Sequence, residues 1–207
     1  MPEVRPPRFS RLSVVPARPA PETAGARRDD ALMALAAAGQ KEAYVELVER
    51  YQRRVRGFCR VLLRDESMAY DLAQDVFLKI WARRAHYRAQ GRFQEFLFSV
   101  ARNTCRSYAR RRALFELLGL SPGAEPLEGA RLVGCDEHER DERLQNLEHA
   151  LLRLPERFRV PLSLRFLEGL DYAEIARVIG RTESAARSRV FYGLKQLSAL
   201  LPPEVRS

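Results

Sequence analysis

The sequence predicts an all-α protein made of two small helical domains joined by an acidic linker. Long stretches are rich in Ala, Leu, Arg, Glu and Gln, which favour helices, and no stretch alternates with the two-residue period of a strand. Aromatic residues make up only 9% and glycines number 11, fewer than an all-β sandwich or barrel needs. The apolar share of 46% is high enough for a folded core.

Residues 1–29 are expected to form a disordered tail. Six of the twelve prolines lie here, and proline denies the backbone the hydrogen bonds of helices and sheets. The tail also carries six arginines. Two interpretations stay open: an extension without function, or a basic tether for nucleic acid.

Residues 30–112 are predicted to form the first domain from four amphipathic helices. Each has apolar residues on one face, so the four faces enclose one core. Ser67 is expected to cap the third helix. The four ranges are 30–39, 41–63, 68–86 and 93–112.

Residues 113–143 are predicted to be the linker, and residues 144–201 the second domain. The linker has eight acidic and three basic side chains, and glycine and proline interrupt it after a short helix expected over 113–119. The second domain has short turns between its helices. Its expected helices are 144–154, 156–167, 172–179 and 183–200.

The charge of the chain indicates an anionic partner. The net charge is +9, the isoelectric point is about 10, and 33 of the 36 basic residues are arginine. Residues 31–112 alone carry 17 basic and 8 acidic side chains. Arginine binds phosphate oxygens and guanine edges better than lysine does, because its planar guanidinium donates two hydrogen bonds side by side.

Several other classes are not indicated. The odd count of three cysteines argues against a disulfide framework, and Cys135 and His138 are only half of a zinc pattern, so we expect no metal or other cofactor. No apolar run reaches the ~20 residues of a membrane span, and no secretory signal is present, so a reduced, cytoplasmic protein is expected. No catalytic or phosphate-loop pattern occurs, so we do not expect an enzyme.

Residues 171–197 have the pattern of a helix-turn-helix. Ile175 and Ile179 give one apolar face, Gly180 allows a turn with positive φ, and Thr182 can cap the next helix. The second helix of such a motif lies in the major groove of DNA. The alternative is a helical hairpin with a solvated arginine face. The side chains expected to contact DNA are Arg181, Thr182, Glu183, Ser184, Arg187, Ser188 and Arg189.

A basic stripe lies on the last helix of the first domain. Arg102, Arg106 and Arg110 follow at four-residue spacing beside Asn103, and like charges so placed destabilise a helix by a few tenths of a kcal/mol per pair. An anion is expected to complete this face; the alternative is a solvated basic surface. Most of the upstream aromatics are expected in the core, and one or two could stack on an unpaired base: Tyr87, Phe93, Phe96 and Phe98.

The third helix has a polar face opposite its apolar stripe. Asp71, Gln74, Asp75 and Leu78 share this face, and acidic residues with one apolar side chain suit a protein partner in so basic a domain. The alternative is a solvated face with an Asp75–Lys79 helix pair.

Over about residues 31–201, the chain resembles a bacterial sigma factor of the extracytoplasmic-function type. In that family, region 2 and region 4 are joined by a linker. The region 2 motifs are Ala69, Asp71-Leu72, Gln74-Asp75-Val76-Phe77, Trp81, Gly91, Phe93, Phe96-Leu97 and Ala101-Arg102-Asn103. The region 4 motifs are Leu154-Pro155, Arg157, Val160, Gly169, Tyr172, Glu174-Ile175-Ala176, Gly180 and Arg187-Ser188-Arg189.

The resemblance implies partners and roles. Residues 30–112 would be region 2, in which the basic stripe and the loop before it read the melted minus-ten element. Residues 144–201 would be region 4, in which the helix-turn-helix reads the minus-thirty-five element, and the linker would pass through the polymerase RNA channel. The sequence leaves open whether an anti-sigma factor also binds. The residues implied to grip the clamp helices of the largest subunit of core RNA polymerase are Asp71, Leu72, Gln74, Asp75 and Leu78.

Three residues depart from the family pattern. Pro161 is expected to bend its helix or move its start, Arg181 replaces an apolar turn residue, and Gly193 costs about 1 kcal/mol of helix propensity. Two other classes stay open. A free-standing helix-turn-helix regulator would need a dimer or ligand domain, which residues 31–112 do not resemble, and a helical adaptor without a DNA role does not explain their charge.

Overall fold

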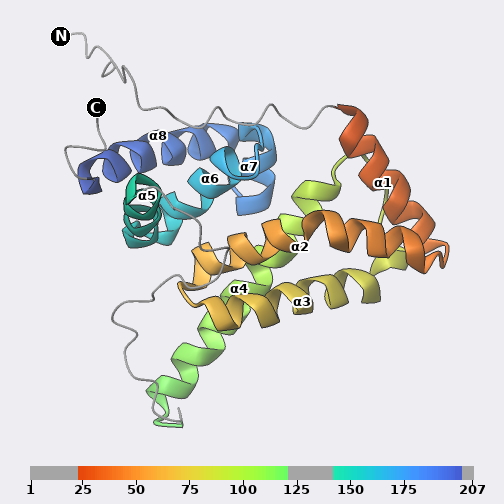
Figure 1. Cartoon of the computed structure of the whole chain (residues 1–207), viewed down its shortest axis with the longest axis horizontal. Helices are drawn as coiled ribbons and strands as arrows, with labels where there is room; N and C mark the ends of the chain where they lie inside the picture. The colour runs from red at the N-terminus through yellow and green to blue at the C-terminus, as the bar shows by residue number, and fades with distance from the viewer. Residues whose placement is uncertain (1–22, 121–141, 202–207) are drawn as a thin grey trace.

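A computed structural model describes residues 23–120 and 142–201, and within these ranges the chain is helical with no strand. Helices α1–α4 form the N-terminal domain and α5–α8 the C-terminal domain, as Figure 1 shows. The all-α prediction is confirmed. The predicted tail up to residue 22 and most of the predicted linker lie outside the described residues.

Helix α1 spans Thr23–Ala37 and therefore begins inside the segment that was expected to be a tail. Two buried acids fix it to the domain. Asp29 accepts hydrogen bonds from Arg50 and Tyr51, and Asp30 accepts them from the Tyr87 hydroxyl and the Gly91 backbone N–H. These partners stabilise a helix that local sequence preference did not indicate.

Helices α2 (Lys41–Leu63) and α3 (Glu66–Ala82) are joined by a tight turn. Arg64 has a left-handed backbone with φ of 61°, and Asp65 then caps α3 by accepting a hydrogen bond from the Met68 N–H at 3.1 Å. The predicted cap Ser67 is wrong, because its hydroxyl lies within the first turn and bonds to Asp65. Helix α3 ends before a 3₁₀ turn, η1 (Arg84–His86), so the predicted single helix to residue 86 is broken.

Helix α4 spans Phe93–Leu117, which is five residues longer than expected. The extension contains an ion pair at helical spacing, since Arg112 lies 2.8 Å from Glu116. Gly119, with φ of 66°, follows the end of the helix. The short separate helix predicted over 113–119 is therefore the last part of α4.

The core of the N-terminal domain forms where α2 packs against α1, α3 and α4. Aromatic rings pack edge to face across it: Phe58 with Phe98 at 5.2 Å, and Tyr51 with Phe93 at 5.6 Å between ring centroids. Other fully buried side chains are Met33, Leu47, Ile80 and Leu97.

The C-terminal domain consists of α5 (Glu142–Arg153), α6 (Glu156–Phe166), α7 (Tyr172–Ile179) and α8 (Glu183–Leu200). These bounds agree with the predicted ones to within two residues. Pro161 lies inside α6 without moving its start, which stays at Glu156. Helix α7 begins with a capping box between Asp171 and Glu174, whose side chains each bond to the other's backbone N–H.

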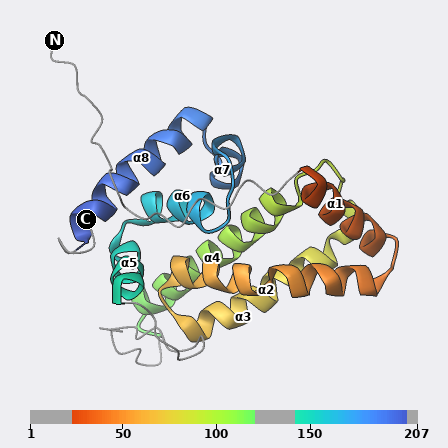
Figure 2. The ribbon, with the colours of Figure 1, turned by 45° about the horizontal axis from the view of Figure 1, so that its top comes forward.

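The two domains pack directly against each other. Helix α7 lies on α4 and α6 lies on α2, as the tilted view in Figure 2 shows. Buried residues of the C-terminal domain, such as Leu164 and Ile175, belong to the same apolar cluster as Phe58. The sequence predicted two domains, and the structure joins them through this shared apolar cluster, while a second cluster around Leu154, Leu162 and Val190 lies within the C-terminal domain.

Candidate functional site

The polar face of α3 is largely where the sequence placed it. Asp71 and Gln74 are exposed, Asp75 is half-buried, and Leu78 is 64% exposed despite its apolar side chain. Leu72 does not lie on this face, because its side chain points into the core and is only 4% exposed. The Asp75–Lys79 pair, which belonged to the alternative interpretation of this face, is not formed; Lys79 instead donates a hydrogen bond to the Thr104 hydroxyl at 3.2 Å.

A groove of about 510 Å³ runs beside this face, between α2 and α3. Gln74 and Leu78 line it together with aromatic side chains, of which Tyr44 and Trp81 pack at 5.0 Å between centroids. Sequence reasoning missed the groove and Tyr70 on its rim. The spacing of Tyr70, Gln74 and Leu78, four residues apart, was the signal that indicates this shared face.

The helix-turn-helix forms as predicted. Gly180 turns the chain with φ of 65°, and the Thr182 hydroxyl accepts a hydrogen bond from the Ala185 N–H at 3.3 Å. Ile175, Ala176 and Ile179 of α7 are buried in one cluster with Ala186 of α8, and Val190 of α8 is buried in a second cluster with Leu154 and Leu162. This packing fixes the direction of α8 and leaves its first turns free for a partner.

Most of the predicted DNA-contacting side chains of this motif are solvent-exposed. Arg187 is held in place by Glu183 at 2.9 Å and lies over the Tyr172 ring at 4.6 Å. Arg189 differs from the others because it is half-buried and turns toward the N-terminal domain. The exposed residues are Arg181, Thr182, Glu183, Ser184, Arg187 and Ser188.

The basic stripe of α4 is divided between solvent and the domain interface. Asn103 and Arg110 are exposed. Arg102 is half-buried and donates to the backbone carbonyl of Val178 at 3.4 Å, and Arg106 lies 3.7 Å from Glu156. Two of the three stripe arginines therefore contact the C-terminal domain. The residue spacing within α4 could not predict these contacts, because it reports only which residues share a face of that helix.

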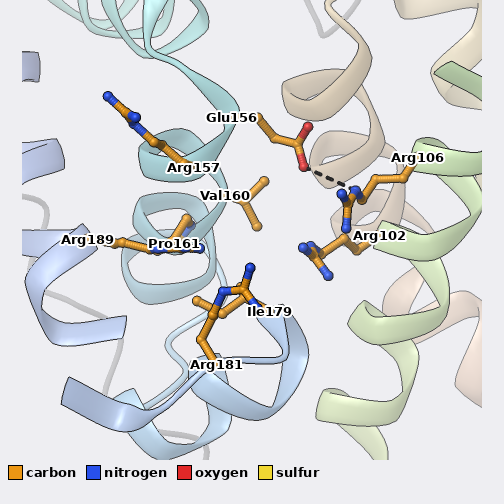
Figure 3. A pocket seen from close by; sticks show the side chains of 9 residues that line it. All are labelled: Arg102, Arg106, Glu156, Arg157, Val160, Pro161, Ile179, Arg181 and Arg189. Carbon is orange, nitrogen blue, oxygen red and sulfur yellow. Dashed lines mark ion pairs between the residues drawn. The ribbon is translucent and has the colours of Figure 1, made fainter. Parts of the chain in front are cut away.

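A cavity of about 310 Å³ lies where this interface opens, and Figure 3 shows the side chains that line it. Arg102 and Arg106 of α4 face Arg181 and Glu156 of the C-terminal domain across it. Burial lowers the pKa of Arg102, and the charges of Arg106, Arg189 and Arg181 lower it further, while Glu156 acts in the opposite direction. The cavity thus concentrates positive charge.

Other arginines hold the interface closed. Arg177 of α7 forms two hydrogen bonds to Glu95 of α4, one of 2.8 Å, and Arg54 of α2 lies 2.7 Å from Glu168. Glu95 and Glu168 are buried, so each depends on its arginine. The sequence could not predict these two pairs, because the partners lie 82 and 114 positions apart.

Arg159 is the most deeply buried arginine of the interface. Its guanidinium donates to the carbonyls of Leu154 at 2.7 Å, Leu152 at 3.0 Å and Leu62 at 3.2 Å, which lie at the ends of α5 and α2. Burial, followed by the charge of Arg64, lowers its pKa to about 10, so it stays charged at neutral pH. A cation at helix C-termini satisfies carbonyls that have no helical partner.

Two of the four aromatic residues before the stripe are buried, whereas most of them were expected in the core. Phe93 and Phe98 are buried in the core. Tyr87 and Phe96 are half-buried and contact each other with 5.2 Å between ring centroids. These two rings are the ones near the surface that could meet a base.

Neither a metal cluster nor a membrane span is found in the part of the chain that the structure describes. No group of three or more His, Cys, Asp or Glu side chains is placed to hold a metal ion there. No described helix is both long and apolar enough to cross a bilayer. Cys135 and His138 lie outside the described residues.

Comparison with known proteins accounts for both domains. The family described as Sigma-70 region 2 matches residues 47–115, and the family described as Sigma-70, region 4 matches residues 144–197. The RNA polymerase sigma-H factor of Pseudomonas aeruginosa is 30% identical over 186 residues, which cover 86% of this chain and 96% of that protein. The ECF RNA polymerase sigma-E factor of Haemophilus influenzae is 30% identical over 184 residues, covering 84% and 96%.

Solved structures share the fold. CnrH in complex with the cytosolic domain of CnrY matches with a TM-score of 0.61 and 24% identity, covering 84% of this chain and 96% of that one. The sigma factor RpoE of Bartonella quintana, in complex with the anti-sigma factor NepR, matches with a TM-score of 0.61 and 23% identity, covering 77% and 96%.

The protein combines a helix-turn-helix with a basic helical domain that has a groove between α2 and α3. This combination is that of a DNA-binding transcription protein. The chain belongs to the sigma-70 family and is a sigma factor of the extracytoplasmic-function type. The family resemblance seen in the sequence is confirmed, and the N-terminal and C-terminal domains correspond to region 2 and region 4.

Proposed function

We propose that the chain binds core RNA polymerase through α3, reads the melted minus-ten element with α4 and reads the minus-thirty-five element with α8. The observation that carries this proposal is the exposed face of α3, where Leu78 stands out beside the aromatic α2–α3 groove. Exposed apolar side chains ringed by polar ones mark protein-binding surfaces.

The polymerase contact combines three kinds of group. Asp71 and Asp75 supply negative charge, Gln74 supplies hydrogen bonds, and Leu78 with the groove supplies apolar area. Basic and apolar residues on the clamp helices of the largest subunit would complement them. Leu72 supports the surface from beneath as part of the core.

The DNA contacts fall on two helices. On α8, Arg187, Ser184 and Ser188 are free to reach phosphates and base edges in a major groove. On α4, Asn103 and Arg110 are open to a single strand, with Tyr87 and Phe96 near the surface for stacking. Arg102 is half-buried against Val178, so it can join them fully only after the C-terminal domain moves off α4, whereas Arg106 is exposed beside Glu156.

Binding of purified core polymerase tests the proposal. The double variant Asp71→Arg, Asp75→Arg should assemble into holoenzyme at least tenfold more weakly than the wild type, with its helix content unchanged. Glu116→Arg, a charge reversal on the exposed end of α4, is the control and should assemble normally. Wild-type affinity in the double variant would contradict the assigned role of α3.

A further inference from the structure

The cavity between α4 and the C-terminal domain holds more positive charge than the chain neutralises. Five arginines line it: Arg102 and Arg106 from α4, Arg181 and Arg189 from the turn and from α8, and Arg157 from α6, whose guanidinium points away from the others in Figure 3. Glu156 is the one carboxylate among its lining residues. Among residues that the structure describes, Arg106 is the one of the four arginines on α4, the turn and α8 with a carboxylate within 4 Å.

This grouping is unfavourable unless something balances it. Like charges brought together in a half-buried space repel each other more strongly than they do in water. Arg102 shows the effect, since burial and then its arginine neighbours lower its pKa. A bound anion would reverse both influences, because it would supply the missing negative charge and accept the free N–H groups.

We propose that this cavity binds a compact polyphosphate anion, namely a triphosphate group, either free or as the tail of a nucleotide. Its volume of about 310 Å³ lies at the small end of the range for ligand pockets. Guanidinium groups bind phosphate oxygens in pairs, so four of them can hold several phosphates in a fixed arrangement. A DNA duplex is far too wide to enter while the domains stay packed.

The ligand would connect the two domains. Arg106 lies on α4 and Arg189 on α8, so an anion held by both stabilises the packed arrangement by binding it alone. It would also withhold these arginines from promoter DNA. That consequence rests on the proposed function, whereas binding of the anion does not.

Calorimetric titration of the full chain with sodium tripolyphosphate and with ATP, at constant ionic strength, tests the proposal. We expect saturable binding of one anion per chain. Arg106→Ala and Arg189→Ala should each raise the Kd about tenfold or more, as expected for the loss of a charge-assisted contact. A lower Kd for tripolyphosphate assigns the site to free polyphosphate, and a lower Kd for ATP assigns it to a nucleotide.

Matched variants separate the cavity from general charge. Arg110→Ala on α4 and Arg187→Ala on α8 remove the same charge one turn or two residues away, outside the cavity, and should leave the Kd within about twofold. All four substituted arginines were predicted to contact DNA. A role in DNA binding alone would therefore not make two of them matter for anion binding and the other two not. Equal weakening by all four, or no saturable binding of the wild type, would overturn the proposal.

A variant outside the cavity tests whether both domains are needed. Arg177→Glu places a negative charge against Glu95 and should push α7 away from α4 without altering any lining residue. We expect loss of tripolyphosphate binding, with helix content retained and domain separation verified by small-angle scattering. Unchanged binding in the separated protein would contradict a site shared by the two domains.

Discussion

Gly193 has a packing role that its residue type conceals. It lies in α8, is buried, and a Cβ atom there would come within 2.9 Å of Leu162 Cδ1 and 3.3 Å of Phe158 Cβ. The sequence interpretation counted this glycine only as a loss of helix propensity. The structure shows that its missing side chain lets α8 approach α6.

Alanine substitutions at two helical glycines should therefore act in opposite directions. Gly193→Ala should lower the free energy of unfolding by about 1 kcal/mol, because overpacking at Leu162 and Phe158 outweighs the gain in propensity. Gly57→Ala in α2, where a Cβ meets nothing within 4 Å, should raise it by about 0.5–1 kcal/mol. Urea unfolding measures both, and equal stabilisation by the two variants would refute the close-approach explanation.

Arg159 acts as an internal cap for two helices, and its loss should be costly. Arg159→Leu should lower the free energy of unfolding by about 2–4 kcal/mol, since it leaves the carbonyls of Leu62, Leu152 and Leu154 without that donor. The exposed Arg153, changed to Leu, should stay within about 0.5 kcal/mol of the wild type. A loss below 1 kcal/mol for Arg159→Leu would contradict the capping role.

At the scale of the helices, local signals decided what could be predicted. The bounds of α7 and α8 follow from Asp171, Gly180 and Thr182, which act on residues within one turn of themselves. The start of α1 could not be predicted in this way. It depends on Asp29, whose partners Arg50 and Tyr51 are 21 and 22 positions away in the sequence.

For the candidate surfaces too, local spacing could be predicted and long-range contacts could not. Helical spacing alone placed Asp71, Gln74 and Leu78 on one exposed face. Leu72 was carried over from the family motif, and a motif match does not distinguish a contact residue from a core residue. The burial of Arg102 follows from α7 packing on α4, a contact 76 positions apart that no periodicity reports.

The exposed part of α4 should be needed for promoter opening. The variant Asn103→Ala, Arg110→Ala should bind core polymerase normally and yet form fewer open complexes, because extruded bases lose phosphate and edge contacts that offset unstacking. Permanganate reactivity of promoter thymines measures the defect.

A pre-melted bubble template should partly rescue this variant, because strand separation is then already complete. Arg111→Ala, an exposed arginine outside the stripe, is the control and should open promoters normally. If the bubble restores nothing, these residues serve another partner or a structural role.

For the molecule as a whole, the domain interface half-buries Arg102 and Arg189, two arginines that the sequence predicted to contact DNA. It combines an apolar cluster with arginine contacts such as Arg177–Glu95 and Arg54–Glu168. Arg102 and Arg106 are held within it. Under the proposed function, Arg102 can reach an opened promoter fully only when the domains separate, whereas Asn103 and Arg110 are already exposed.

Charge reversal at the interface should shift the balance between packed and separated domains. Arg177→Glu should increase the radius of gyration measured by small-angle scattering, because two carboxylates then face each other at α4 and α7. Arg177→Lys keeps the charge and should stay compact. An unchanged radius in Arg177→Glu would mean that the apolar contacts alone hold the domains together.

Run-off transcription with purified core polymerase on genomic promoter fragments tests the central claim most directly. The wild-type chain should yield transcripts that start at defined sites, and the Asp71→Arg, Asp75→Arg variant should yield few. Core polymerase without the chain should yield none at these sites. If the chain instead binds promoter duplexes tightly without polymerase and supports no transcript with it, it acts as a free-standing regulator, and the assignment of α3 to polymerase is contradicted.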